Sequence, residues 1–181
     1  MSFKIKVLVF LATILVVAGA VKVAYNRAVD RYFPFEYKEE ITKYSKESGL
    51  NINLVIAVIN AESGFDPSAH SGVAKGLMQI TDETAMWICN KMEMTYYEDM
   101  AYAPETNIKM GCWYLSYLVK KYRSVDTALA AYNAGAGNVN KWLENPEYSS
   151  DGKTLSYIPF EETRNYVLRV RKMMGIYQKA Y

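Results

Sequence analysis

One glutamate follows a strongly apolar run in the stretch VIAVINAESGF, from Val55 to Phe65. Glu62 comes shortly after the apolar residues 54–59 and directly before a Ser-Gly pair. A run that is apolar on every side predicts a buried helix, and buried helices rarely carry an unpaired acid. Burial and the negative end of the helix dipole both raise the pKa of a carboxyl group. A carboxyl group that keeps its proton near neutral pH can act as a general acid.

Position alone does not establish this chemistry, because a glutamate at a helix end is more often a capping or ion-paired residue. Other catalytic residue types are scarce: the chain has one histidine, His70, and two cysteines, Cys89 and Cys112. A zinc site needs about four ligands with local spacing, and the sequence lacks such a set. It also lacks a Gly-x-Ser-x-Gly turn for a serine nucleophile. We therefore predict no metal and no cofactor.

The two cysteines leave two interpretations open. Cys89 and Cys112 each lie among apolar residues in a predicted helix. Two buried free thiols fit this setting, and a disulfide fits an exported protein equally well.

The charge distribution argues against nucleic acid as a partner. The chain has 21 basic and 19 acidic residues, and three of the lysines lie in residues 1–25, which contain no acid. The remainder therefore carries 18 basic and 19 acidic residues, a net charge of −1. Nucleic-acid binding requires a basic surface. The 16 tyrosines indicate a different kind of ligand, because a flat ring with a polar tip suits sugar faces.

Residues 1–25 predict a transmembrane signal-anchor, with a cleaved signal peptide as the alternative. The segment from Val7 to Val21 has no charge, and its apolar flanks extend it toward the roughly 20 residues that span a bilayer. Lys4 and Lys6 favour a cytoplasmic N-terminus. The small residues 18–20 fit a signal-peptide cleavage site. Both interpretations export the remainder, and the anchor predicts a single-pass protein of the cell membrane with an extracytoplasmic catalytic domain.

Beyond this segment we predict a short stalk at 26–35 and one all-α domain at 36–181. Capping residues and breakers define its helices: one stops at Gly49, and further helices start near Asn51, Thr81, Pro104, Ser124, Gly137 and Pro159. In the last helix an inner face is predicted at Val167, Val170, Met174 and Tyr177, and a solvated face at Arg164, Arg169, Arg171 and Lys172. No strand pattern and no internal repeat is found, and the stretch SAHSGVAKG is predicted to be a loop.

Three separated segments together favour catalysis over helix capping for Glu62. The segments ESGFDPSAHSGVAKGLMQIT, AYNAG and IPFEETRNYV, with the helix phrase PETNIKMGCWYL, occur in this order. They resemble the Slt-type lytic transglycosylases, the lysozyme-like family that cleaves peptidoglycan, and the resemblance extends from about Tyr37 to Tyr177. It implies a lysozyme-like fold and peptidoglycan glycan strands as the substrate. Protein partners are not identified by it.

The resemblance also implies the residues of the site. Glu62 matches the catalytic acid, followed by Ser63 as in the family. The implied substrate-binding residues are Ser71, Met78, Gln79, Tyr132, Asn133 and Tyr166. The family pattern Ser-x-x-Gly-Ala-x-Gly is one residue shorter here, in SGVAKG, which affects the loop that carries Ser71.

The implied reaction uses a single acid. Hydrolytic glycosidases usually need two carboxylates, and Asp66, the nearby acid, precedes Pro67 and suits a turn. In the family's reaction Glu62 cleaves the bond between N-acetylmuramic acid and N-acetylglucosamine, and the muramic 6-hydroxyl closes onto C1 to give a 1,6-anhydro end. Two alternatives remain: a hydrolytic muramidase on the same fold, and a non-catalytic wall-binding scaffold.

Overall fold

The structure is a computed structural model, and it describes residues 2–181. The chain divides into two compact units, residues 1–35 and 36–181. The helices are α1 (Phe3–Tyr32), α2 (Lys38–Ser48), α3 (Ile52–Glu62), α4 (Asp82–Met92), the short 3₁₀ helix η1 (Met100–Tyr102), α5 (Pro104–Tyr122), α6 (Val125–Ala134), α7 (Ala136–Leu143) and α8 (Glu161–Ala180). The strands are β1 (His70–Ser71), β2 (Ala74–Lys75) and β3 (Ile80–Thr81).

The first unit consists mainly of α1. This helix continues without a break to Tyr32, so most of the segment predicted to be a stalk is helical. Its part from Phe3 to Tyr25 contains 23 residues and is apolar enough to cross a membrane. At 1.5 Å per residue this part is about 34 Å long, compared with about 30 Å for a bilayer core. A signal sequence near the N-terminus has the same features.

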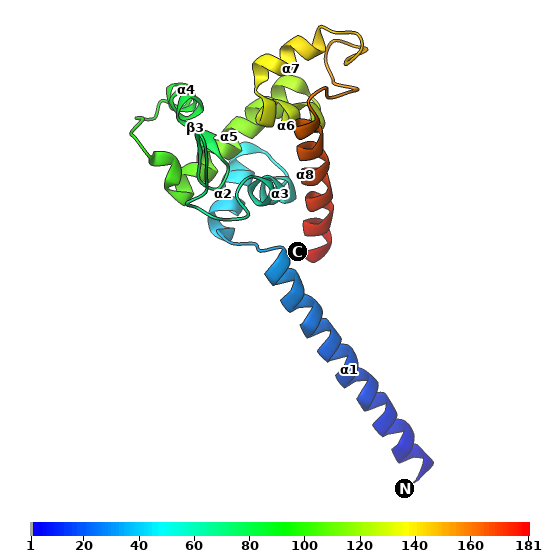
Figure 1. The fold of residues 1–181 in the computed structure, drawn as a ribbon. Helices are drawn as coiled ribbons and strands as arrows, with labels where there is room; N and C mark the ends of the chain where they lie inside the picture. Colours follow the sequence, from blue (N-terminus) through cyan, green and yellow to red (C-terminus); the bar gives the residue numbers. More distant parts are fainter. Residues whose placement is uncertain (1) are drawn as a thin grey trace. The chain divides into compact units, whose positions relative to one another are not determined.

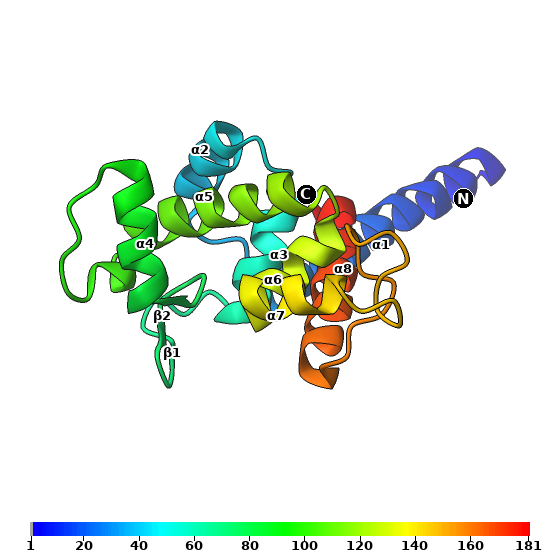
Figure 2. The same ribbon diagram turned by 90° about the horizontal axis from the view of Figure 1, so that it is seen from above.

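The second unit is built around α3 and α5. All six residues from Leu54 to Ile59 are buried, as their apolar character on every side predicts. Helix α3 packs against α8, and α5 packs against α2, α4 and α6. Figure 2 shows α5 crossing the domain between α4 and α6. Each buried Leu, Val or Ile side chain stabilises such a core by about 1.5–3 kcal/mol.

Of the six predicted helix starts, five lie within one residue of the structure and one differs. Helix α7 begins at Ala136, one residue before Gly137. Asn51, Thr81 and Ser124 are N-caps whose side chains accept hydrogen bonds from backbone N–H groups two or three residues later. Pro104 is the first residue of α5. Helix α8 begins at Glu161, two residues beyond the predicted start at Pro159. The prediction of an all-α fold is confirmed for the main elements.

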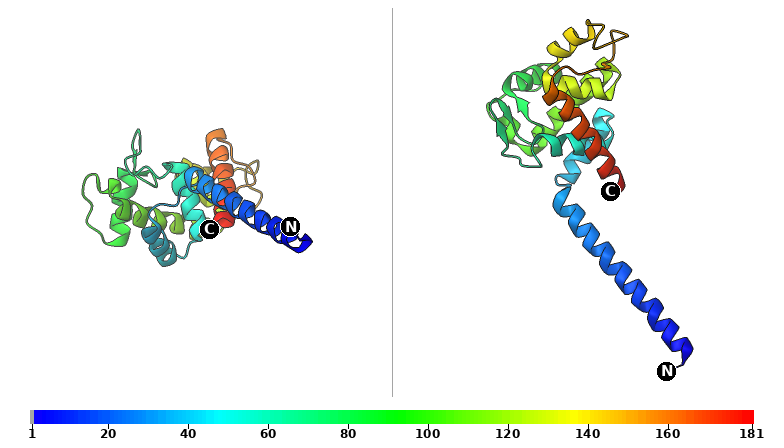
Figure 3. Two further views of the ribbon diagram at one scale, coloured as in Figure 1. Left: turned by 90° about the horizontal axis from the view of Figure 1, so that it is seen from below. Right: turned by 45° about the vertical axis from the view of Figure 1, so that its right-hand side comes forward.

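The prediction of a loop between α3 and α4 was wrong in part, because this segment contains a small antiparallel sheet. The strand order is β1-β2-β3, with His70 opposite Lys75 and Lys75 opposite Ile80. Each strand has two residues, which is too short for a detectable alternation of apolar and polar residues. In the right-hand view of Figure 3 the green segment with these strands lies at the left of the domain, and the yellow α7 lies at its top.

The structure agrees with the interpretation that the two cysteines are buried free thiols. Cys89 and Cys112 are both buried and free. The Sγ atom of Cys89 lies 3.7 Å from the Sδ atom of Met100, so this thiol packs as a small apolar group.

Candidate active site

Glu62 is the last residue of α3, and its burial raises the pKa of its carboxyl group from 4.5 to about 7. Desolvation is the largest cause of this shift. Two groups on α8 act in the opposite direction: a hydrogen-bonding interaction with Tyr166 and the positive charge of Arg169 both favour the ionised carboxylate. The Glu62 carboxyl group therefore holds its proton to a much higher pH than an exposed glutamate does.

Two tyrosine hydroxyls lie beside Glu62, and both stay neutral. Tyr166 on α8 is buried, and its hydroxyl interacts with the Glu62 carboxyl group. Tyr132 on α6 donates a hydrogen bond of 2.8 Å from its hydroxyl to the carbonyl of Met78. Burial and the nearby charge of Glu62 raise the pKa of both tyrosines well above 10. Helices α3, α6 and α8 thus bring one acid and two neutral hydroxyl groups together.

Ser63 connects the end of α3 to the segment before β3. Its hydroxyl donates a 2.8 Å hydrogen bond to the carbonyl of Leu77 and accepts one from the N–H of Phe65 at 3.1 Å. The backbone at Glu62 is therefore held to the residue that precedes Met78.

Asn107 on α5 holds the segment around Met78 by side-chain hydrogen bonds. It is fully buried, and its Oδ1 accepts a 2.7 Å hydrogen bond from the N–H of Met78. Its Nδ2 donates to the carbonyls of Lys75 and Ala101. The phrase PETNIKMGCWYL contains Asn107, but its role could not be read from sequence because the three bonded groups lie on other segments.

Met78 was predicted to line a sugar cleft, but its side chain lies in the core. It is fully buried, and it packs against Gly111, where an added Cβ would lie 2.2 Å from the Met78 Sδ atom. Its carbonyl and N–H bond to Tyr132 and Asn107. Met78 therefore contacts the site through its backbone.

Ser71 and Gln79 contact each other across the small sheet. The Ser71 hydroxyl donates a 2.6 Å hydrogen bond to Gln79 Oε1, and Gln79 Nε2 donates to the carbonyls of Ala69 and Gly76. Gln79 thus fixes the shortened loop, while Ser71 is exposed. Asn133 is exposed on α6 next to Tyr132, and its side chain forms no hydrogen bond with any residue that the structure describes.

Arg169 is exposed on α8, as predicted for the solvated face, but it also contacts the end of α3. Its Nη2 donates a 3.2 Å hydrogen bond to the carbonyl of Ala61, and its guanidinium carbon lies 5.8 Å from the centre of the Tyr166 ring. The spacing of three residues between Tyr166 and Arg169 places both on one helix face. This spacing was the available signal for its place near Glu62.

A second carboxylate is not found beside Glu62 in the described part of the chain. Asp66 accepts hydrogen bonds from the N–H and the hydroxyl of Ser68, so it forms the predicted turn. No group of three His, Cys, Asp or Glu residues within 2–181 could hold a metal ion. The arrangement provides one carboxyl group that can both give and take a proton near neutral pH.

The comparison with protein families agrees with this geometry. Residues 39–155 match the family model described as the transglycosylase SLT domain. The chain belongs to this family. The matched range of the SLT domain contains Glu62 and Tyr132, whereas Tyr166 and Arg169 lie beyond it.

Named relatives of this SLT chain include soluble and membrane-bound proteins. The soluble lytic murein transglycosylase of Salmonella typhimurium is 35% identical over 147 residues, covering 78% of this chain and 23% of that protein. The membrane-bound lytic murein transglycosylase C of Glaesserella parasuis is 27% identical over 174 residues, covering 83% and 46%. The chain therefore spans about a quarter of the length of the Salmonella relative.

Solved structures share the fold of the SLT chain. An inactive mutant of the lytic transglycosylase Slt from Pseudomonas aeruginosa, with Gln in place of Glu at one position, matches with a TM-score of 0.73 and 32% identity over 83% of this chain and 25% of that one. The 70 kDa soluble lytic transglycosylase of Escherichia coli matches with the same TM-score, identity and coverage.

Proposed function

We propose that this protein is a peptidoglycan lytic transglycosylase. It cleaves the β-1,4 bond between N-acetylmuramic acid and N-acetylglucosamine and leaves a 1,6-anhydro end. The observation that supports this most directly is a single carboxyl group with a pKa near 7 and no carboxylate partner. Hydrolytic glycosidases usually place two carboxylates about the bond. The names of the relatives support the same substrate and reaction.

In the first step Glu62 donates its proton to the glycosidic oxygen, and the electrons of the C1–O bond leave with that oxygen. The 2-acetamido oxygen of the muramic acid stabilises the positive charge at C1. This substrate-derived group takes the place of the second carboxylate. The Tyr166 hydroxyl, which interacts with the Glu62 carboxyl group, donates to the carboxylate that this step leaves on Glu62.

In the second step the Glu62 carboxylate removes the proton of the muramic 6-hydroxyl, and O6 forms a bond to C1. The acid is regenerated and no water is consumed. Tyr132 and Asn133 bind the sugar from α6, and Ser71 binds it from the rim of the small sheet. Met78 and Gln79 support the site indirectly, because their hydrogen bonds fix the backbone that faces Glu62.

Digestion of purified peptidoglycan with the full-length protein tests the proposal. Mass spectrometry should find muropeptides that end in 1,6-anhydro-muramic acid and are lighter by one water than hydrolysis products. Reducing ends in their place would identify a hydrolytic muramidase. Binding without cleavage would identify a wall-binding scaffold.

Replacing Arg169 with Gln is expected to shift the pH profile of activity upward. The positive charge of Arg169 lowers the pKa of Glu62, so its removal raises that pKa above about 7. Cleavage requires the protonated acid, and the decline of kcat/KM at high pH should therefore begin at a higher pH. Rates measured across the neutral and alkaline range check this result.

Arg171→Gln is the matched control for this measurement. Arg171 lies on the same helix, but its Nε bonds to Asp126 at 3.0 Å. Its removal should leave the profile in place. An unchanged or downward shift for Arg169→Gln contradicts the proposed electrostatic role.

We further propose that α1 holds the enzyme in the cell membrane as a single-pass anchor with the catalytic domain outside the cytoplasm. The length and composition of residues 3–25 support this, as does the membrane-bound relative. Protease added to intact spheroplasts should remove the domain at 36–181. The intact mass of the purified protein should still include the first 20 residues, whereas their loss would identify a cleaved signal peptide.

A further inference from the structure

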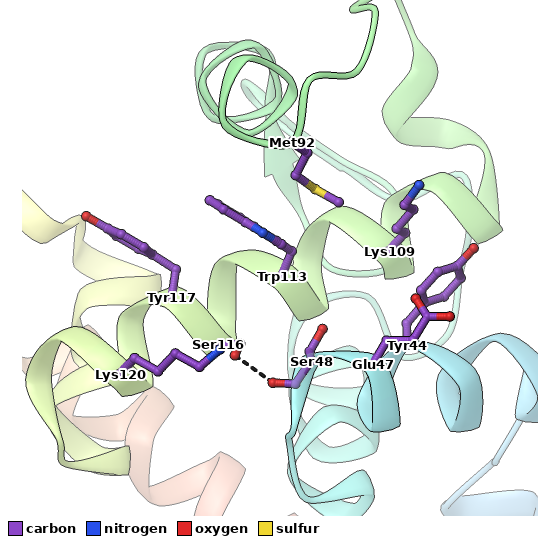
Figure 4. Close-up of a pocket in the computed structure, with 9 residues that line it drawn as sticks. All are labelled: Tyr44, Glu47, Ser48, Met92, Lys109, Trp113, Ser116, Tyr117 and Lys120. Carbon is purple, nitrogen blue, oxygen red and sulfur yellow. Dashed lines mark hydrogen bonds between the residues drawn. The ribbon is translucent and has the colours of Figure 1, made fainter.

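A groove distinct from the Glu62 site lies between α2 and α5 (Figure 4). It has a volume of about 360 Å³, and Met92 at the end of α4 borders it on one side. Tyr44 and Glu47 line the groove from α2, and Lys109 and Trp113 line it from α5. The proposed reaction uses none of these residues, although the helix phrase PETNIKMGCWYL of the family resemblance contains Lys109 and Trp113.

Aromatic rings give the groove a flat apolar wall. The rings of Trp113 and Tyr117 are stacked, with centres 5.8 Å apart and planes at 6°. Tyr117 is 37% exposed, so part of its ring is accessible to a ligand. Exposed flat rings with a polar edge suit the apolar faces of pyranose sugars.

The same rings lead without a break to the candidate active site. Trp87 on α4 contacts Tyr117 with ring centres 5.1 Å apart and Tyr114 with centres 5.9 Å apart. Tyr114 in turn contacts Tyr132, with centres 5.5 Å apart. We call these five rings, from Trp113 to Tyr132, the aromatic track. A second hollow of about 320 Å³ along it is lined by Trp87, Tyr114 and Tyr117.

The charges of the groove favour an anionic glycan over a neutral one. Lys109 and Lys120 line it from α5, whereas Glu47 is its single acid. Neither lysine belongs to the ion pairs found within the described residues. Peptidoglycan strands carry a carboxylate on the lactyl group of N-acetylmuramic acid or on the attached peptide. Such a strand therefore matches both the rings and the lysines.

We infer that the groove is a second binding site for the glycan strand that is cut at Glu62. The inference rests on the proposed function, because the strand has to be the substrate. Long strands therefore bind at both sites, and short fragments bind at the Glu62 site alone. The structure thus assigns the protein a preference for long strands.

Binding to peptide-free glycan strands tests this inference. Calorimetry is performed on the full-length Glu62→Gln protein, which should not cut its ligand, with strands of one, two and more than four disaccharides. Trp113→Ala should weaken binding of the long strands roughly 2- to 10-fold, as the loss of one stacked ring predicts. Binding of a single disaccharide should not change. Lys109→Gln, an exchange that removes charge without opening the core, should weaken long-strand binding and reduce its salt dependence.

Tyr97→Ala is the matched control, since Tyr97 is 56% exposed and lies outside the track. It should leave binding of all strand lengths unchanged. Equal weakening for short and long strands, or no weakening in either groove variant, would overturn the inference. The proposed function is judged separately by the product mass of the wild-type protein. Anhydro ends without a length effect reject the second site alone, whereas reducing ends reject the reaction alone.

Discussion

Replacing Glu62 with Gln is expected to remove nearly all turnover of peptidoglycan. The amide keeps the shape of the side chain but has no proton to give and cannot take one. General acid–base assistance contributes about 10²- to 10⁴-fold in rate, and here one group provides it in both steps. The release of anhydro-muropeptides over time, followed by mass spectrometry, measures the loss.

The same substitution is expected to make the protein more stable at alkaline pH. The folded-state pKa of Glu62, about 7, lies above the value of 4.5 expected for an exposed glutamate. Ionisation therefore destabilises the fold as pH rises from about 4.5 to about 7. Above this window the variant should gain up to about 3 kcal/mol in free energy of unfolding. Below it the two proteins should be equal.

Asp66→Asn provides the control, because Asp66 is the acid closest to Glu62 in sequence and accepts its hydrogen bonds from Ser68. This variant should keep its activity. Full activity in Glu62→Gln would reject the assignment of the catalytic acid. Loss of activity together with loss of the fold would assign Glu62 a structural role.

The second large effect is expected for Asn107→Ala, on stability as well as activity. The substitution removes three hydrogen bonds in a fully buried position. It leaves the N–H of Met78 and the carbonyls of Lys75 and Ala101 without this partner. Unsatisfied buried groups cost about 1–3 kcal/mol each, so the free energy of unfolding should fall by roughly 3 kcal/mol or more. Chemical denaturation followed by circular dichroism measures the change.

Asn140→Ala is the control for Asn107→Ala, because it removes the same type of side chain from an exposed position. The exposed Asn140 side chain accepts one hydrogen bond, from the Tyr122 hydroxyl at 2.9 Å. Its removal should cost about 1 kcal/mol or less and should not change activity. If Asn107→Ala were as mild as this control, the buried amide would not be what holds Met78 in place.

The helical framework could be predicted from sequence because its signals are local. The caps at Asn51, Thr81 and Ser124 lie directly beside the helices that they start. The run from Leu54 to Ile59 marks the central helix by composition alone. The small sheet could not be predicted in this way. Its strands are held by Gln79 and Asn107, which contact backbone groups up to 32 residues away.

Some residues of the candidate site could be predicted from local sequence signals, whereas others depend on contacts between distant segments. Glu62 has a local signal, an acid that closes an apolar helix, and the resemblance adds the two tyrosines. The buried position of Met78 depends on Gly111, more than 30 residues later in the chain. The place of Arg169 depends on how α8 packs against α3. Contacts between distant segments leave no trace in a local pattern.

The backbone at Met78 joins the candidate site to the hydrophobic core. Its N–H and carbonyl bond to Asn107 and Tyr132, while its side chain fills the space above Gly111. Local opening of this segment would have to break buried packing and hydrogen bonds at once, and core segments of this kind have opening free energies that approach that of global unfolding. The chemistry and the fold therefore belong to one cooperative unit. We therefore expect the candidate site and the hydrophobic core to lose their structure together when the domain unfolds.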